Sequence, residues 1–255
     1  MKIVVIEPLG VKQEALDTLA SEILPQGAEV VYYGNRAGST QELIERGKDA
    51  DVIIVANQPL PAEAIRGFEK LKLLSVAFTG YDHVAMDACR EKGVVVCNCA
   101  GYSTAAVADL TFGLILSLYR NIGECDRRIR QGGTKAGLIG PELEGKKFGV
   151  IGAGAIGQRV IRIAQAFGCE VYAYSRTRKE RPGVVWADLD TLLEECDIIS
   201  LHVPLNDSTR GLIGQAQLHK MKNTALLINT ARGPVVDSAA LAAALEQGEI
   251  AGCGV

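Results

Sequence analysis

The stretch that decides the fold is KKFGVIGAGAIGQRVIRIAQAFGCEVYAYSRTRK, residues 146–179. Its central GAGAIG, residues 152–157, follows an apolar run and opens a helical pattern, and a second apolar run closes the unit. A G-x-G-x-x-G in this setting is typical of a dinucleotide-binding βαβ unit. We expect Gly152 to permit a tight turn, Gly154 to admit a pyrophosphate at the helix N-terminus, and Gly157 to let the helix pack on the strand. The competing interpretation is a glycine-rich turn that binds no ligand.

The end of the second apolar run indicates which dinucleotide binds. A carboxylate there usually holds the ribose hydroxyls of NAD. This sequence has instead, in order, Ser175, Arg176, Thr177, Arg178 and Lys179, with Arg181 close behind. A hydroxyl and guanidinium groups suit a 2′-phosphate, which a carboxylate would repel. We therefore predict NADP(H) as the favoured cofactor and NAD(H) as the alternative; a solvated basic turn would favour neither.

Short β-branched runs alternate with amphipathic patterns on both sides of this motif. Runs rich in Val, Ile and Leu are typical of parallel strands that are buried on both faces and joined by crossover helices. The sequence thus predicts an α/β protein with two doubly wound parallel sheets. The predicted strands are Ile3–Ile6, Glu29–Tyr32, Val52–Val55, Leu73–Ala77, Val94–Cys97, Lys147–Ile151, Glu170–Tyr174, Ile198–His202, Ala225–Asn229 and the segment IAGCGV at 250–255. Predicted helices include Lys12–Ile23, Thr40–Lys48 and a helix that Gly248 closes.

The alternation breaks near Cys99. A long helical pattern follows, with Ser103 or Thr104 as its N-cap. Residues 127–146, RRIRQGGTKAGLIGPELEGK, are glycine-rich and aperiodic, which indicates an exposed arm. We predict a first domain over residues 1–98 and a second over residues 99–255, to which the long helix belongs.

Composition excludes several classes of protein. Apolar residues make up 48% of the 255 residues, charged residues 22%, and the net charge is −3, which favours neither nucleic acid nor a membrane as partner. The longest apolar stretch, at 110–119, has about half the length of a membrane span, and no signal-peptide pattern follows Met1. The seven cysteines are scattered and lack a Cys-x-x-Cys pair. They indicate unpaired thiols in a reducing cytoplasm and no metal site.

The segment ALLINTARGPVVD, residues 225–237, places Arg232 just after a predicted buried strand. Ligands of open α/β sheets bind outside the carboxyl ends of the strands. Arg232 is therefore a candidate for gripping a carboxylate or polarising a carbonyl oxygen. From position alone, a surface Arg paired with an acid is an equal alternative.

The second half of the chain resembles the D-isomer-specific 2-hydroxyacid dehydrogenases. The matching segments, in family order and spacing, are TGYDHVAMDACREKGVVVCN (79–98), GYSTAAVADLTFGLIL (101–116), LEGKKFGVIGAGAIGQ (143–158), CDIISLHVPLNDSTRGLI (196–213) and MKNTALLINTARGPVVD (221–237). The resemblance covers residues 73–255 well and residues 1–72 only in rhythm. It implies a flavodoxin-like substrate domain, a Rossmann domain, and hydride transfer between NAD(P) and a small 2-keto or 2-hydroxy acid. The match looks most like glyoxylate and hydroxypyruvate reductases, or phosphoglycerate dehydrogenase.

The resemblance also implies roles for single residues. Arg232 would bind substrate and act in catalysis, and the backbone N–H groups of Thr79 and Gly80 would receive the substrate carboxylate. Val203 and Pro204 would line the adenosine pocket. The implied cofactor-binding residues are Gly152, Gly154, Ala155, Ile156, Gly157, Ser175, Arg176, Thr177, Arg178, His202, Val203, Pro204, Thr230 and Ala231.

None of the three histidines occupies the family's acid/base position. We expect His83 to cap a helix or pack, His202 to hydrogen-bond locally, and His219 to lie on a solvated helix face. In the family the acid/base His, the Glu that orients it and a helix returning to the first domain all follow the segment AG-x-G-V. We therefore expect these parts beyond Val255, and expect residues 1–255 alone to bind the cofactor without useful turnover.

Two further expectations concern other classes of function and assembly. A regulatory protein that binds NAD(P) without turnover fits the same fold, and oxidation of NADPH with glyoxylate or hydroxypyruvate distinguishes it from an enzyme. The resemblance implies a homodimer that packs through the long helix and the arm. The alternative is a monomer with an exposed loop.

Overall fold

Parallel strands and crossover helices form two separate sheets. The computed structural model describes residues 1–178 and 180–255, so Lys179, which belongs to the predicted basic segment, lies outside the described residues. The chain divides into a first unit, Met1–Tyr102, and a second unit, Ser103–Val255. The predicted α/β fold with two parallel sheets is confirmed.

The first unit contains a five-stranded sheet with the order β2-β1-β3-β4-β5. All its pairings are parallel, with Val4 opposite Val31 on one side and opposite Ile53 on the other. This is the strand order of flavodoxin-like folds. The elements are β1 (Lys2–Val5), α1 (Gln13–Ile23), β2 (Glu29–Tyr32), α2 (Thr40–Gly47), β3 (Val52–Val55), α3 (Ala62–Gly67), β4 (Leu73–Val76), α4 (Met86–Lys92) and β5 (Val95–Asn98).

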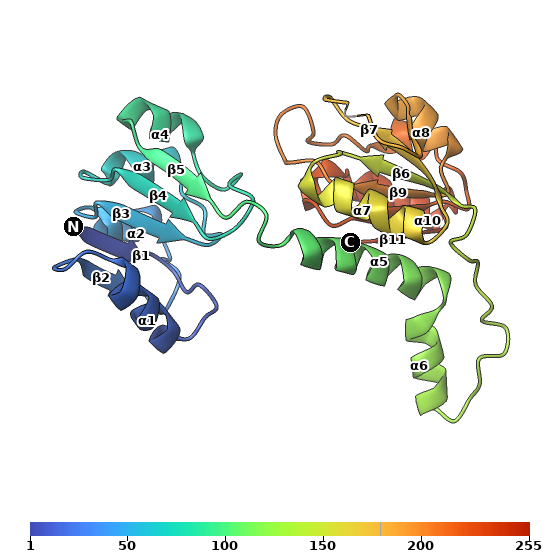
Figure 1. Cartoon of the computed structure of the whole chain (residues 1–255), viewed down its shortest axis with the longest axis horizontal. Helices are drawn as coiled ribbons and strands as arrows, with labels where there is room; N and C mark the ends of the chain where they lie inside the picture. Colours follow the sequence, from blue (N-terminus) through green and yellow to red (C-terminus); the bar gives the residue numbers. More distant parts are fainter. Residues whose placement is uncertain (179) are drawn as a thin grey trace. The chain divides into compact units, whose positions relative to one another are not determined.

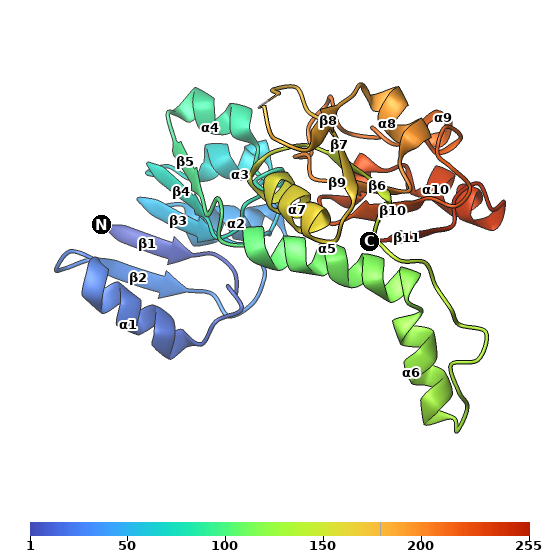
Figure 2. The same ribbon diagram turned by 45° about the vertical axis from the view of Figure 1, so that its right-hand side comes forward.

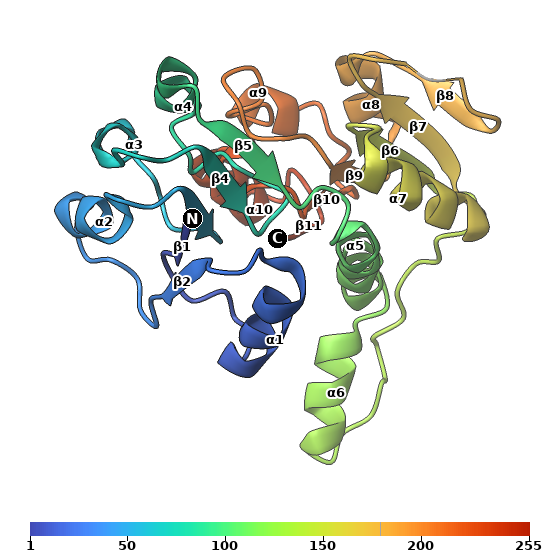
Figure 3. The same ribbon diagram turned by 60° about the vertical axis from the view of Figure 1, so that its left-hand side comes forward.

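The main apolar cluster of the first unit lies on one face of its sheet, and on the other face Ile3 and Val5 of β1 are also buried. Helices α2, α3 and α4 pack against the main cluster, at side chains such as Val4, Ile53 and Leu74. Helix α1 lies on the other face (Figure 3) and has no buried residue in the described chain. Val95 on that face is 59% exposed. The prediction that strands of this sheet are buried on both faces is therefore wrong at β5, because a β-branched run looks the same whether or not a helix covers it.

The second unit contains a six-stranded parallel sheet with the order β11-β10-β9-β6-β7-β8. Helices α5 and α7 cover one face, and α8, α9 and α10 cover the other (Figure 2). Its elements are α5 (Thr104–Tyr119), α6 (Ile122–Arg130), β6 (Lys147–Ile151), α7 (Ala155–Ala166), β7 (Glu170–Tyr174), β8 (Val184–Trp186), α8 (Leu189–Glu195), β9 (Ile198–Leu201), α9 (Gln215–Leu218), β10 (Leu226–Asn229), the 3₁₀ turn Gly233–Val235, α10 (Ser238–Glu246) and β11 (Gly252–Gly254).

The predicted arm at 127–146 begins as helix. Residues up to Arg130 belong to α6, where Glu124 pairs with Arg127 at 2.7 Å and Arg128 at 2.7 Å, and Asp126 pairs with Arg130 at 2.8 Å. Pairs spaced three and four residues apart stabilise this helix. The later part of the arm is irregular, and it projects from the unit together with α6 (Figure 1).

Among the described residues, no single helix is long and apolar enough to cross a membrane. The bent pair formed by Thr104–Tyr119 and Ile122–Arg130 meets the criterion only by combined length and composition.

Candidate functional site

Three glycines between β6 and α7 form a tight turn. Gly152 has a φ of +100°, and a Cβ on it would lie 2.5 Å from the carbonyl oxygen of His202. A Cβ on Gly157 would lie 2.0 Å from the carbonyl oxygen of Gly152. Both positions therefore require glycine, the first for conformation and space and the second for close packing of helix on turn. At Gly154, in contrast, no described atom lies within 4 Å of a Cβ position, so this residue borders open space.

The start of α7 offers backbone donors beside that open space. Gly154 is the extended N-cap and contributes no side chain to the first turn. The first N–H groups of an α-helix have no acceptor within the helix, and here they belong to Ala155, Ile156 and Gly157. Together with the positive end of the helix dipole they suit a phosphate.

A cavity of about 270 Å³ opens next to this turn. The strand order reverses at β6, which pairs with β7 on one side and β9 on the other, and such switch points are where α/β sheets bind ligands. The residues that line the cavity are Gly152, Ala153, Gly154, Tyr174, Ser175, Arg176, His202, Val203, Pro204, Ser208, Thr209 and Leu212. The turn that only glycine can form and the adjoining cavity fit a bound dinucleotide.

The predicted basic segment divides at the end of β7. Ser175 and Arg176 line the cavity, whereas Thr177 and Arg178 are exposed and are not among its lining residues. Sequence position alone does not tell which way each side chain points after a strand ends. The described part of the segment therefore brings one hydroxyl and one guanidinium group to the cavity.

His202 lies on the opposite wall of the cavity from that segment. Its Nε2 and Ser200 Oγ share a hydrogen bond of 2.9 Å, which confirms the expected local bond. Burial lowers the pKa of His202 to about 4, so the imidazole is neutral near neutral pH. Its Nδ1 is buried and has no hydrogen-bond partner among the described residues. A neutral imidazole of this kind is suited to packing and hydrogen bonding.

Thr209, on the same wall, was not among the residues expected from the sequence. Its side chain is nearly buried at 9% exposed; Oγ1 donates to the carbonyl oxygen of Pro204 at 2.6 Å and accepts the N–H of Asn206 at 2.9 Å. These bonds fold the segment after β9 back on itself at the cavity. An Asn-x-x-Thr spacing in a loop was the available signal.

Side chains hold the loop after β10 from within. Asn229 is 8% exposed; its Oδ1 accepts the N–H of Ala231 at 3.1 Å, and its Nδ2 donates to the carbonyl oxygen of Arg232 at 2.8 Å. The Thr111 hydroxyl donates to the Val107 carbonyl oxygen at 2.8 Å and lies 3.0 Å from Thr230 Oγ1. Because its one proton is used, Thr111 accepts from Thr230. The loop bearing Thr230, Ala231 and Arg232 is thus tied to its own strand and to α5.

In the first unit, Thr79 and Gly80 follow β4. The Thr79 carbonyl oxygen accepts Nδ2 of Asn98 at 2.6 Å, and its hydroxyl donates to the Cys99 carbonyl oxygen at 3.4 Å. His83 lies a few residues later, and its carbonyl oxygen accepts the N–H of Leu60 at 2.8 Å. The segment is therefore fixed by its neighbours on both sides.

His219 lies far from the cavity in the second unit. It follows α9 and precedes β10, so it belongs to the amino-terminal edge of the sheet, whereas the cavity opens at the carboxyl edge. The ring is exposed, as expected, and its Nδ1 lies 2.8 Å from a carboxylate oxygen of Glu249. This His–Glu pair is separated from the cavity by the length of the strands.

Comparisons with known proteins identify the family. Residues 112–255 match the family model described as D-isomer specific 2-hydroxyacid dehydrogenase, NAD binding domain. A glyoxylate reductase of Korarchaeum cryptofilum is 38% identical over 85% of this chain and 68% of its own length. A hydroxypyruvate reductase of Blautia hydrogenotrophica is 32% identical over 100% of this chain and 82% of its own.

A solved structure shows the same architecture. An acyclic imino acid reductase in complex with NADPH and D-Arg superimposes with a TM-score of 0.91 and 30% identity over 99% of this chain and 81% of its own. The chain belongs to the D-isomer-specific 2-hydroxyacid dehydrogenase family, whose members are NAD(P)-dependent oxidoreductases.

Proposed function

We propose that this dehydrogenase prefers NADP(H) and reduces a small 2-keto acid. The observation that carries the proposal is the pair Ser175 and Arg176 in the wall of the cavity beside the glycine turn. A 2′-phosphate there would accept bonds from a hydroxyl and a guanidinium group. A charge-assisted bond contributes roughly 1.5–3 kcal/mol, which corresponds to about one to two decades of preference for NADPH over NADH.

Titration of the protein with NADPH and NADH tests this preference. In Ser175→Asp, a carboxylate would face the 2′-phosphate, and we expect the preference to narrow or reverse. Thr177→Asp is the matched control, because it adds the same charge at an exposed position outside the cavity lining. Equal dissociation constants for the two cofactors in the unmodified protein would remove the assignment.

The first unit, with predicted limits 1–98, is proposed to bind the keto acid, and the second, 99–255, the dinucleotide. Relatives named glyoxylate reductase and hydroxypyruvate reductase support a small 2-keto acid as substrate. The backbone N–H groups of Thr79 and Gly80 would receive its carboxylate, Arg232 is the proposed substrate-binding residue of the second unit, and the dinucleotide would supply the hydride. The hydrogen bond from Asn229 Nδ2 to the Arg232 carbonyl oxygen supports this role, because it fixes the backbone from which the guanidinium extends.

Arg232 can be tested by conservative replacement. Lysine keeps the charge but loses the planar fork. In a form of the enzyme that turns over, we expect Arg232→Lys to lower kcat about tenfold to a thousandfold, on the scale of losing one oxyanion donor, with NADPH affinity little altered. Normal turnover in Arg232→Ala would exclude Arg232 from the mechanism.

We also propose that none of the described histidines supplies the proton. A His202 pKa of about 4 and the position of His219 at the opposite edge of the sheet support this. General acid catalysis contributes about 10²–10⁴-fold, so residues 1–255 should bind NADPH and turn over glyoxylate or hydroxypyruvate slowly. A sample of confirmed 27.1 kDa mass that turns over at about 10 per second would contradict this and make His83 the first residue to replace.

The same observations favour a second candidate function, redox sensing through NADP(H) binding without turnover. Steady-state NADPH oxidation in the presence of glyoxylate or hydroxypyruvate separates the two. We further propose a cytoplasmic location, supported by seven unpaired cysteines in the described chain.

Finally, we propose a homodimer through α5 and α6, whose Leu110, Ile122 and Ile129 are 55%, 53% and 60% exposed. A monomeric mass by light scattering at micromolar concentration would contradict it.

A further inference from the structure

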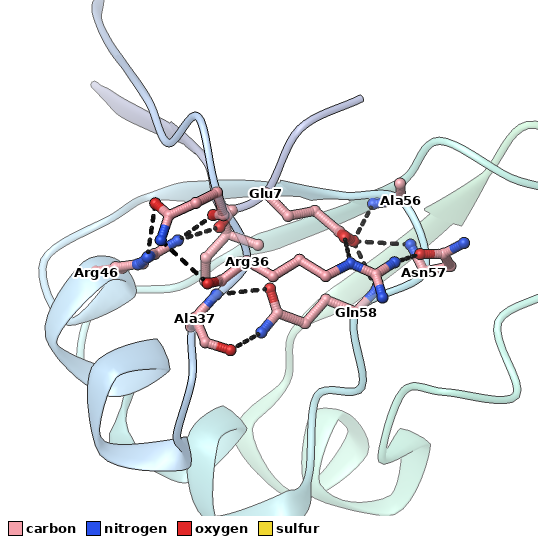
Figure 4. A network of polar contacts seen from close by, with 9 residues as sticks. Glu7, Arg36, Ala37, Arg46, Ala56, Asn57 and Gln58 are labelled. Carbon is pink, nitrogen blue, oxygen red and sulfur yellow. Dashed lines mark hydrogen bonds and ion pairs between the residues drawn. The ribbon is translucent and has the colours of Figure 1, made fainter. Parts of the chain in front are cut away.

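The carboxyl edge of the first sheet carries a polar cluster that the proposed function leaves unexplained. Glu7 follows β1 and is 1% exposed. One of its carboxylate oxygens accepts the backbone N–H groups of Ala56, Asn57 and Gln58, which follow β3, at 2.9, 2.7 and 2.6 Å. The other oxygen accepts Nε of Arg36, which follows β2, at 3.0 Å (Figure 4). A buried carboxylate thus joins three strand ends.

Bonds within the cluster occupy its side-chain acceptors. The side-chain oxygen of Asn57 accepts a guanidinium N–H of Arg36. The side-chain amide of Gln58 exchanges two bonds with the backbone of Ala37, at 3.2 and 2.8 Å. Among the described residues, the outer N–H groups of Arg36 and the amide NH₂ of Asn57 have no further hydrogen-bond partner, and both side chains are exposed, Arg36 by 55%. We name these two residues the donor rim, because they present hydrogen-bond donors to solvent.

The donor rim stands at the switch point of the first sheet. Strand β1 pairs with β2 on one side and β3 on the other, and ligands of such sheets bind outside the carboxyl ends at that reversal. The segment after β3 is tied to the one after β4: Ala77 N–H donates to the Val55 carbonyl oxygen at 2.8 Å, and Leu60 N–H donates to His83. Neighbouring strands lie about 4.8 Å apart, a spacing comparable to the length of a three- or four-carbon acid.

We propose that the donor rim binds the far end of the substrate and selects 2-keto and 2-hydroxy acids that carry a second anionic group. This inference rests on the proposed placement of the first carboxylate at Thr79 and Gly80. A second carboxylate or a phosphate would accept bonds from Arg36 and Asn57. An aliphatic side chain would displace water from these donors without replacing its bonds, which is unfavourable. Glu7 is a positioning residue, because it fixes both members of the rim.

Two stable 2-hydroxy acids test the selection without any need for turnover. D-malate carries a second carboxylate and D-lactate does not. Each is titrated into the ¹⁵N-labelled protein with NADPH present, and the amide resonances of Thr79, Gly80 and Asn57 are followed. We expect both acids to shift Thr79 and Gly80, D-malate alone to shift Asn57, and D-malate to bind about three- to tenfold more tightly, the range for exposed charge-assisted bonds.

Variants of the rim should remove the preference. Asn57→Asp places an anion beside Arg36, and Arg36→Gln removes the cation; both should bring D-malate to the affinity of D-lactate. The matched control is Arg66→Gln, because Arg66 has a similar exposure of 57% and also pairs with a carboxylate, Glu91, at 2.9 Å. It should keep the preference. Arg36→Gln removes the counter-ion of the buried Glu7 carboxylate. If this variant unfolds the first unit, Asn57→Asp alone tests the donor rim, since the Asn57 side chain is exposed.

The outcomes separate this inference from the proposed function. Equal affinities for D-malate and D-lactate, with shifts at Thr79 and Gly80, overturn the donor rim and leave the carboxylate site in place. A preference that persists in Asn57→Asp and Arg36→Gln also overturns the rim. If neither acid shifts Thr79 and Gly80, the carboxylate site is wrong and the inference fails with it.

Discussion

The two sheets differ at the carboxyl end of their first strand. In the second unit, β6 runs into Gly152, and a cavity of about 270 Å³ lies between that turn and the segment after β9. In the first unit, β1 is followed by Glu7, whose carboxylate bonds directly to the segment after β3. Both positions are switch points of parallel sheets. Near the end of the first strand, a glycine leaves room beside the second sheet, whereas a buried carboxylate fills the corresponding place in the first sheet. We therefore expect the residues that follow the first strand, rather than the fold, to decide which ligand each unit can hold.

The largest expected effect comes from filling the open switch point. Gly152→Ala would place a methyl group 2.5 Å from the His202 carbonyl oxygen at a φ of +100°. Backbone strain alone amounts to about 1–3 kcal/mol, so we expect the second unit to lose stability and NADPH affinity to fall about a hundredfold. Fluorescence titration and hydrogen exchange measure the two effects.

Gly154→Ala is the control for that experiment. Its φ is −73° and no described atom lies within 4 Å of the new Cβ. We expect unchanged thermal stability together with weaker NADPH binding, because the methyl group would occupy space meant for phosphate. If Gly152→Ala bound NADPH normally, the contrast between an open and a closed switch point would lose its basis.

The next largest effect comes from removing the Glu7 carboxylate at the switch point of the first sheet. Glu7→Ala would leave three backbone N–H groups without their acceptor and Arg36 without its counter-ion. An unsatisfied buried group costs about 1–3 kcal/mol, and we expect a loss of about 2–4 kcal/mol confined to the first unit. Hydrogen exchange at β1 and β3 should quicken while NADPH affinity stays unchanged. Glu29→Ala, at a carboxylate 65% exposed, should change stability by less than about 0.5 kcal/mol.

The glycine turn was predictable from sequence and the carboxylate brace was not. The turn is local: its three glycines, strand and helix are contiguous, and β6 and β7 lie at the predicted Lys147–Ile151 and Glu170–Tyr174. Glu7 acts on residues 49 to 51 positions later, and Thr111 meets Thr230 across 119 positions. Nothing near a lone Glu or Thr in the sequence announces such a partner, so these bonds require the structure.

Side-chain direction and sheet coverage could not be predicted from the sequence for a similar reason. Ser175 to Arg178 were predicted as one group, yet only the first two line the cavity, because the chain turns after β7. Strand β8 was missed because three residues, Val184–Trp186, give too short a pattern. Conversely, the two sheets, their parallel order and most strand limits follow from the β-branched runs.

A third prediction uses a feature that both units share. Asp51 accepts the N–H of Lys2 and the ammonium of Lys72, each at 2.9 Å. Asp197 accepts the N–H of Lys147 and the ammonium of Lys222, also at 2.9 Å each. Asp51 lies just before β3, which pairs with β1, and Asp197 lies just before β9, which pairs with β6. The same pair of contacts therefore anchors both sheets.

These pairs give an acid-dependent stability. Lys72 and the Lys2 N–H lower the pKa of Asp51 to about 2; for Asp197, burial would raise the pKa, but Lys222 and the Lys147 N–H outweigh it and lower it. A depressed carboxyl pKa stabilises the fold above the unfolded value of about 3.9 and loses that effect as pH falls toward the folded value.

We therefore expect Asp51→Asn and Asp197→Asn to lower stability to urea at about pH 6 and to approach the unmodified protein at about pH 3. Asp87→Asn, at a side chain 90% exposed, should behave like the unmodified protein at both. A loss in either variant that is the same at both pH values would show that the carboxylate charge is not its cause.

The smallest effect concerns the faces of the two sheets. Val171 on β7 is 1% exposed beneath a helix layer, whereas Val95 on β5 is 59% exposed on the face that α1 leaves open. Replacement by Thr keeps the shape and adds a hydroxyl. At Val171 the hydroxyl would be buried, which costs about 1–3 kcal/mol; at Val95 water solvates it, and we expect a change within about 0.5 kcal/mol. Urea unfolding of the two variants measures the difference. An equal loss at both sites would mean that Val95 is covered in solution, and the contrast between the exposed face of β5 and the covered faces of the second sheet would then have to be abandoned.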